Sequence, residues 1–138
     1  MHFCIFRTKH FGPNILKGAI DGKHCLVQNF AKAGTLFRNY KSSFSLVLFA
    51  ITDSHYKFLF CDVGNPGSAN DAFIWNNSTF KERLDAGDLG LPQDENEKVK
   101  FHLLGDDIFA LSETLMKPYP RSNLEPKQLI FNYRHSYH

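Results

Sequence analysis

The chain has 138 residues, of which 43% are hydrophobic and 22% are charged, as expected for a single globular domain. A formal net charge of +2 is too small to indicate nucleic-acid binding by itself. No segment has the length and apolar character of a membrane span, and the first residues lack the apolar region of a secretion signal. The odd number of cysteines, Cys4, Cys25 and Cys61, favours buried, reduced thiols over a disulfide framework.

Three strands are predicted first. Gly18–Val27 contains Asp21, although aspartate is depleted in strands. Phe44–Thr52 is a continuous apolar run, which is typical of a strand buried on both faces. Tyr56–Val63 follows after a short turn, so it should form an antiparallel hairpin with the preceding strand. The three strands can therefore form an antiparallel meander.

A helix is predicted next, from Asp71 as its N-cap to about Ala86, with Gly87 ending it. The polar stretch 92–98 reads as a solvated loop. A fourth strand, Val99–Leu104, follows it and leads directly into Gly105, Asp106 and Asp107.

The last predicted elements are a short helix, Ile108–Lys117, and a strand, Gln128–Tyr133. The order of elements fits one α/β domain over residues 1–138, with a mixed sheet in which strand four returns beside strand one. This is the order expected of an RNase H-like fold, with one closing helical segment missing.

The chemistry is expected at Asp21 and Asp106, because strands one and four are predicted neighbours. Two close carboxylates raise each other's pKa unless a cation lies between them, and Mg²⁺ or Mn²⁺ prefers such oxygen ligands. Two ions about 3.5–4 Å apart can activate water and stabilise the leaving oxygen of a phosphodiester. Capping of a following helix is the alternative role of Asp106, and it also explains Asp71. Asp107 is a second ligand or merely a neighbour.

Five blocks of the sequence resemble PIF/Harbinger-type transposases in order and with plausible spacing. They cover about residues 11–136. The blocks are GAIDGKH (18–24), NYKSSFSLVLFAITDSHYKFLFCDVG (39–64), GSANDAFIWNNSTF (67–80), LLGDDIFALSETLMKPYP (103–120) and FNYRHS (131–136).

The resemblance implies an RNase H-like fold and two-metal DDE chemistry, in which DNA is cut and its ends are joined by strand transfer. The first acid maps to Asp21. Asp71 and Asp106 compete for the second, and the fold order favours Asp106. The third acid would be a glutamate on a helix beyond the FNYRHS block, where this chain has stopped. The fragment is therefore expected to be inactive, and a degenerate or domesticated DNA- or protein-binding module is the alternative.

The resemblance also implies DNA as substrate, a separate DNA-binding partner protein, and the nucleus, with the cytoplasm as the alternative. Four basic residues near strand one are expected to contact DNA phosphates. The competing interpretation is that they are ordinary solvent-exposed side chains. They are Lys23, His24, Arg38 and Lys41. Trp75 is expected in the core. His135, near the end of the chain, is expected to be exposed.

Overall fold

The computed structural model describes residues 17–53, 55–89 and 101–136. The chain divides into two compact units. Unit 1 comprises Met1–Asp21, Ile51–Leu59 and Gly90–His138, and unit 2 comprises Gly22–Ala50 and Phe60–Leu89. The predicted loop 92–98 and the start of the predicted strand Val99–Leu104 lie outside the described residues.

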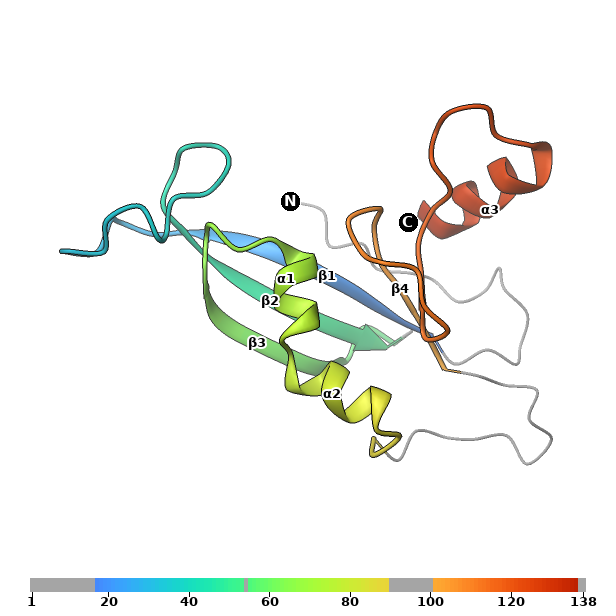
Figure 1. The fold of residues 1–138 in the computed structure, drawn as a ribbon, viewed down its shortest axis with the longest axis horizontal. Coiled ribbons are helices and arrows are strands. Elements are labelled where there is room, and N and C mark those ends of the chain that lie inside the picture. The colour runs from blue at the N-terminus through green and yellow to red at the C-terminus, as the bar shows by residue number, and fades with distance from the viewer. Residues whose placement is uncertain (1–16, 54, 90–100, 137–138) are drawn as a thin grey trace. The chain divides into compact units, whose positions relative to one another are not determined.

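The described strands form a five-stranded mixed sheet in the order β3-β2-β1-β4-β5. Their bounds are β1 Lys17–Leu26, β2 Ser45–Asp53, β3 Phe58–Pro66, β4 His102–Leu104 and β5 Leu115–Met116 (Figure 1). β1 pairs with β4 in parallel, and β4 pairs with β5 in parallel. The predicted meander and the return of strand four beside strand one are thus confirmed, and the α/β class is confirmed with them.

The hairpins of the meander follow from local hydrogen bonds. The Val27 N–H donates to the Phe44 carbonyl (3.0 Å), so the end of β1 lies beside the start of β2. The Asp53 N–H donates to the Lys57 carbonyl (2.9 Å) and closes the turn between β2 and β3. In β2, no side chain from Leu46 to Thr52 is exposed, which confirms that this strand is buried on both faces.

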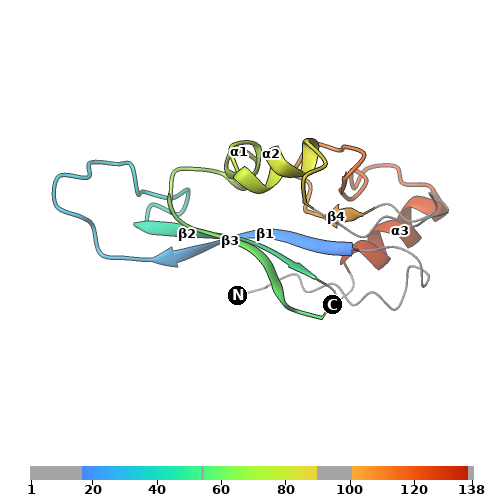
Figure 2. The same ribbon diagram turned by 90° about the horizontal axis from the view of Figure 1, so that it is seen from below.

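In unit 2, two short helices replace the single helix predicted over Asp71–Ala86. They are α1 (Asp71–Asn76) and α2 (Thr79–Asp85), and Figure 2 shows both on one face of the strands. The prediction was wrong because Ser78 caps a new helix: its Oγ accepts from the Lys81 N–H (3.2 Å) and donates to the Trp75 carbonyl (2.8 Å). Gly87, at φ 70°, follows the end of α2, as predicted.

Aromatic side chains hold these helices to the sheet. The Phe80 ring lies 5.5 Å from the Phe60 ring of β3 and 6.3 Å from the Trp75 ring. Trp75 is buried, which confirms its placement in the core. Cys25 and Cys61 are exposed, so the prediction of buried thiols is wrong for these two, and Cys4 lies outside the described residues.

In unit 1, two predicted elements have the opposite secondary structure. The predicted helix Ile108–Lys117 is a turn followed by β5, because the N–H of Leu103 bonds to the Thr114 carbonyl (2.7 Å) in the ladder. The predicted strand Gln128–Tyr133 lies within a helix, α3 (Pro126–Ser136). Proline suits the first turn of a helix, where its missing N–H is not needed. Within the described ranges, no helix has the length and apolar character needed to cross a membrane.

Replacing Ser78 with alanine tests the break between α1 and α2. The change removes both hydrogen bonds of a buried side chain, and we expect it to lower the free energy of unfolding by about 1–2 kcal/mol. Urea denaturation monitored by the fluorescence of Trp75 measures this. Ser122→Ala, at an exposed serine, is the matched control and should stay within about 0.5 kcal/mol of the parent. Equal midpoints for the two variants would contradict the capping role.

Candidate functional site

The register of β1 against β4 relates Asp21 to Asp106. Ala19 pairs with Leu104 in this parallel ladder. Asp21 lies two residues beyond Ala19, and Asp106 lies two residues beyond Leu104. Because paired residues of parallel strands point to the same face, continuing this register two residues past the end of β4 would put the two aspartates on the same face of the sheet.

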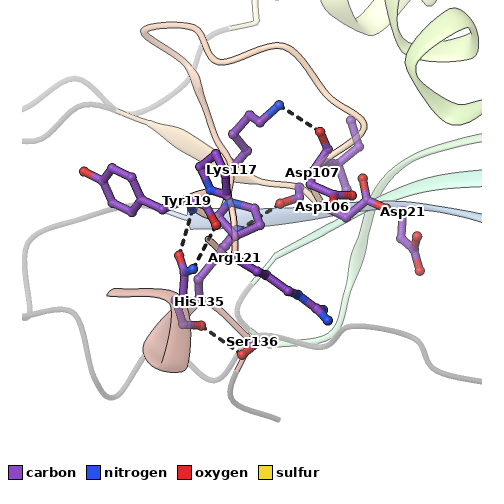
Figure 3. A pocket seen from close by; sticks show the side chains of 13 residues that line it. Asp21, Asp106, Asp107, Lys117, Tyr119, Arg121, His135 and Ser136 are labelled. Carbon is purple, nitrogen blue, oxygen red and sulfur yellow. Dashed lines mark hydrogen bonds between the residues drawn. The ribbon is translucent and has the colours of Figure 1, made fainter. Parts of the chain in front are cut away.

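A pocket of about 600 Å³ lies within unit 1. Three carboxylates, Asp21, Asp106 and Asp107, line it together with the cations Lys117 and Arg121 (Figure 3). Its other lining residues are Ile20, Gly105, Pro118, Tyr119, Pro120, Asn132, His135 and Ser136. The structure thus brings three of the four predicted acidic site residues into one pocket.

Asp106 occupies a tight turn after β4. Its Oδ1 accepts the N–H of Ile108 (3.1 Å), so the predicted capping function exists, although no helix follows. Burial of the carboxyl group raises the pKa of Asp106, and the hydrogen bond from Ile108 opposes this effect. The negative charge of Asp107 raises the pKa of Asp106 further, and Lys117 opposes it. A carboxylate in this environment is stabilised by an added cation.

The segment 117–121 forms another wall of the pocket. Lys117 Nζ donates to the Asp107 carbonyl (2.8 Å), which ties this wall to the acidic turn. Tyr119 is fixed to α3 by two hydrogen bonds: its N–H donates to Asn132 Oδ1 (2.8 Å), and its carbonyl accepts from Asn132 Nδ2 (2.9 Å). Pro118 and Pro120 on either side restrict the backbone further. This wall is therefore held in one conformation.

His135 was predicted to be exposed, and this is wrong. Its side chain is 3% exposed, and its Nε2 lies 2.8 Å from the Gly105 carbonyl. Because a carbonyl only accepts, Nε2 carries the proton in this bond. His135 therefore connects α3 to the residue immediately before Asp106. The helical spacing of Gln128, Phe131 and His135 could have indicated a shared inward face, had the segment been recognised as a helix.

Asp71 belongs to unit 2 and does not line this pocket. It is the first residue of α1, and the N-cap is Asn70, whose Oδ1 accepts the Phe73 N–H (2.8 Å), so the prediction that Asp71 is the N-cap is wrong. The Asp71 carboxylate packs over Gly22 so closely that a Cβ there would overlap it. Gly22 directly follows Asp21, which keeps Asp71 as the reserve candidate.

The four basic residues predicted to contact phosphate all belong to unit 2. His24 Nδ1 bonds Ser45 Oγ (2.9 Å), and Ser45 is completely buried, so His24 has a structural role there. The Lys41 ammonium lies 5.4 Å from the centre of the Tyr40 ring, whereas Arg38 is exposed. Lys23 is half-buried. DNA contact by these residues stays a prediction.

The carboxylates that line the pocket can be tested against the needs of a divalent metal ion. Three carboxylates supply the oxygen ligands that Mg²⁺ and Mn²⁺ prefer, and one of them has a pKa raised by burial. In the described part of the chain, no three His, Cys, Asp or Glu side chains converge closely enough to form a complete ligand cluster. The carboxylate oxygens are of the kind that Mg²⁺ or Mn²⁺ prefers, but the described residues do not complete a ligand set for either ion.

Replacing Asp106 with asparagine separates its electrostatic cost from its hydrogen bond, because the amide oxygen can still accept from Ile108. A pKa raised in the folded state means that the metal-free protein gains stability as the pH falls from neutral through the folded pKa. At pH 7 in EDTA, we expect Asp106→Asn to be at least as stable as the parent. Its advantage over the parent should disappear as the pH falls, because the parent then protonates Asp106 and gains stability.

Thermal melts between pH 7 and pH 4 measure this effect. Asp107→Asn is the control, because it removes a carboxylate that is exposed and lies in the same turn. A marked loss of stability in Asp106→Asn at pH 7 would show that the carboxylate is stabilised by the fold.

Comparisons with known proteins identify a family that the chain resembles. The model of the DDE superfamily endonuclease family matches residues 20–138. Protein ALP1-like from Arabidopsis thaliana is 32% identical over an alignment of 126 residues that covers 86% of this chain. The chain spans 31% of the length of that relative. No solved structure matches the chain significantly.

Proposed function

The chain belongs to the DDE superfamily of endonucleases, and on that basis we propose that it is the metal-dependent DNA nuclease domain of a PIF/Harbinger-type transposase or of a protein derived from one. One observation carries the proposal: the parallel pairing of β1 with β4, which leads Asp21 and Asp106 into the same pocket. Since chromosomal DNA is the substrate of such an enzyme, we assign its action to the nucleus.

In this proposal Asp21 and Asp106 hold the metal, with Asp107 and Asp71 as further candidates. A bound divalent ion supplies Lewis-acid activation of the phosphodiester and of the attacking water. Asp21 is carried by a long strand of the sheet, and this limits how far its carboxylate can move. Asp106 is fixed by its bond to Ile108 and by the bond of His135 to the neighbouring Gly105. The chain's own part is therefore to present carboxylates in a fixed arrangement.

Metal binding by these aspartates can be measured directly. We expect Asp21→Asn and Asp106→Asn each to weaken Mn²⁺ binding by about tenfold or more, because each change removes a ligand and a negative charge. Calorimetric titration of the 138-residue chain is the measurement. Asp62→Asn is the matched control, since Asp62 is also carried by a strand, β3, but does not line the pocket.

The same titration assigns the remaining candidates. Loss of affinity in Asp71→Asn but not in Asp106→Asn would move the second ligand to Asp71. If none of these changes alters Mn²⁺ affinity, the proposed metal site is wrong.

A third acid of the DDE type is not found among the described residues that line the pocket, which include no glutamate. We therefore expect the 138-residue chain to bind Mn²⁺ without detectable cleavage of supercoiled plasmid, since misplacement at such a site costs about 100-fold in rate. The plasmid assay uses Asp21→Ala to exclude a contaminating nuclease. Nicking by the parent that vanishes in Asp21→Ala would show that the aspartates suffice.

A binding module without catalysis is the second candidate. The observation that favours it is the lack of a complete ligand cluster within the described ranges. DNA binding that is unchanged by Asp21→Asn and by EDTA would support this candidate over the nuclease.

A further inference from the structure

Two cations face the acidic pocket from one short segment. Lys117 and Arg121 are separated by Pro118, Tyr119 and Pro120, and both line the pocket. Lys117 is half-buried and bonded to the Asp107 carbonyl, whereas Arg121 is exposed and forms no hydrogen bond or ion pair within the described ranges. Figure 3 shows the side chain of Arg121 extended among the residues that line the pocket. A guanidinium that does not pair with nearby carboxylates is available to a ligand.

The charges of the pocket indicate what that ligand is. Three aspartates against one lysine and one arginine leave the pocket formally negative by one charge, and a single divalent ion reverses that sign. A group that enters after the metal is therefore an anion. A guanidinium binds a phosphate through two parallel hydrogen bonds, and the lysine adds a point charge.

The segment is also rigid enough to bind with little loss of entropy. Asn132 holds Tyr119 through both of its backbone polar groups, at 2.8 and 2.9 Å. The Tyr119 ring packs edge-on against Phe131, 5.3 Å away. The backbone between the two cations is therefore fixed before any ligand arrives, and preorganisation of this kind increases affinity.

We propose that Lys117 and Arg121 form a phosphate-binding edge of the pocket, which holds the backbone of a DNA strand next to the aspartates. The proposal rests on the nuclease function and assigns DNA contact to residues of unit 1. The basic residues Arg38 and Lys41 of unit 2 are the competing surface.

Fluorescence anisotropy of a labelled DNA duplex with the 138-residue chain in Mn²⁺ tests the proposal. We expect Arg121→Ala to weaken binding about tenfold, as the loss of a charged hydrogen bond predicts. The slope of log K against log salt concentration should become shallower by about 0.9, which corresponds to one lost phosphate contact. Arg121→Lys should retain the slope and recover part of the affinity, because the charge remains while the paired bonds are lost.

Arg134→Ala is the matched control, since Arg134 is an exposed arginine of α3 that does not line the pocket, and it should bind within about twofold of the parent. Thermal melts check folding, because Arg121 has no bond within the described residues to lose. The proposal is overturned if Arg121→Ala binds DNA as tightly as Arg134→Ala does. It is also overturned if the double variant Arg38→Ala/Lys41→Ala weakens DNA binding whereas Arg121→Ala does not.

Calorimetry keeps this test separate from that of the nuclease. Arg121→Ala should bind Mn²⁺ as the parent does, whereas Asp106→Asn should not. Suppose that the aspartates prove not to bind Mn²⁺ but Arg121→Ala still loses DNA binding. The metal site would then be rejected, and the phosphate-binding edge would be supported.

Discussion

Backbone hydrogen bonding between β1 and β4 fixes where Asp21 and Asp106 can lie. Glycine permits this close pairing at Gly18, where a Cβ would lie 2.8 Å from Leu103 Cδ2 and 3.0 Å from the Thr52 carbonyl oxygen. Gly105 has the same function at the end of β4, since a Cβ there would meet the Phe109 ring at 2.6 Å. A side chain at either position would force β4 or its neighbours to shift. Asp21, three residues after Gly18, and Asp106, directly after Gly105, would move with them.

Polar side chains of α3 attach this helix to the segments that line the pocket. Asn132 and His135 face inward and bond the backbone at Tyr119 and Gly105, whereas Leu129, Ile130 and Tyr133 are exposed. This helix therefore reverses the usual arrangement, in which apolar residues face the core. Its inward polar groups make specific bonds to the two segments that line the pocket, so they position the pocket walls as well as the helix.

The inward polar and outward apolar residues of α3 explain why its sequence was mistaken for a strand, whereas β2 was recognised. The run of Phe44–Thr52 is buried whichever face it presents, so β2 was predicted correctly. The apolar residues of Gln128–Tyr133 suggested a strand because their spacing does not mark a buried helical face. Local signals of a helix were present in Glu125, Pro126 and Gln128, since Gln128 Oε1 accepts the Glu125 N–H (2.9 Å) as in a capping box. β5 could not be found in this way, because two residues become a strand only through their pairing with β4.

The sequence alone marks Asp21 as a candidate, because a carboxylate inside a strand requires a compensating partner, and the structure places it in the pocket. The electrostatics of Asp106 were not predictable, since they depend on burial and on the arrangement of Asp107 and Lys117 around the carboxyl group. The charges of Asp106, Asp107 and Lys117 also link the carboxylates of the proposed site to its phosphate-binding edge. The cation that would relieve the repulsion between the carboxylates also makes the pocket attractive to a phosphate at Arg121. In the proposed site, metal binding and phosphate binding would then be coupled through charge.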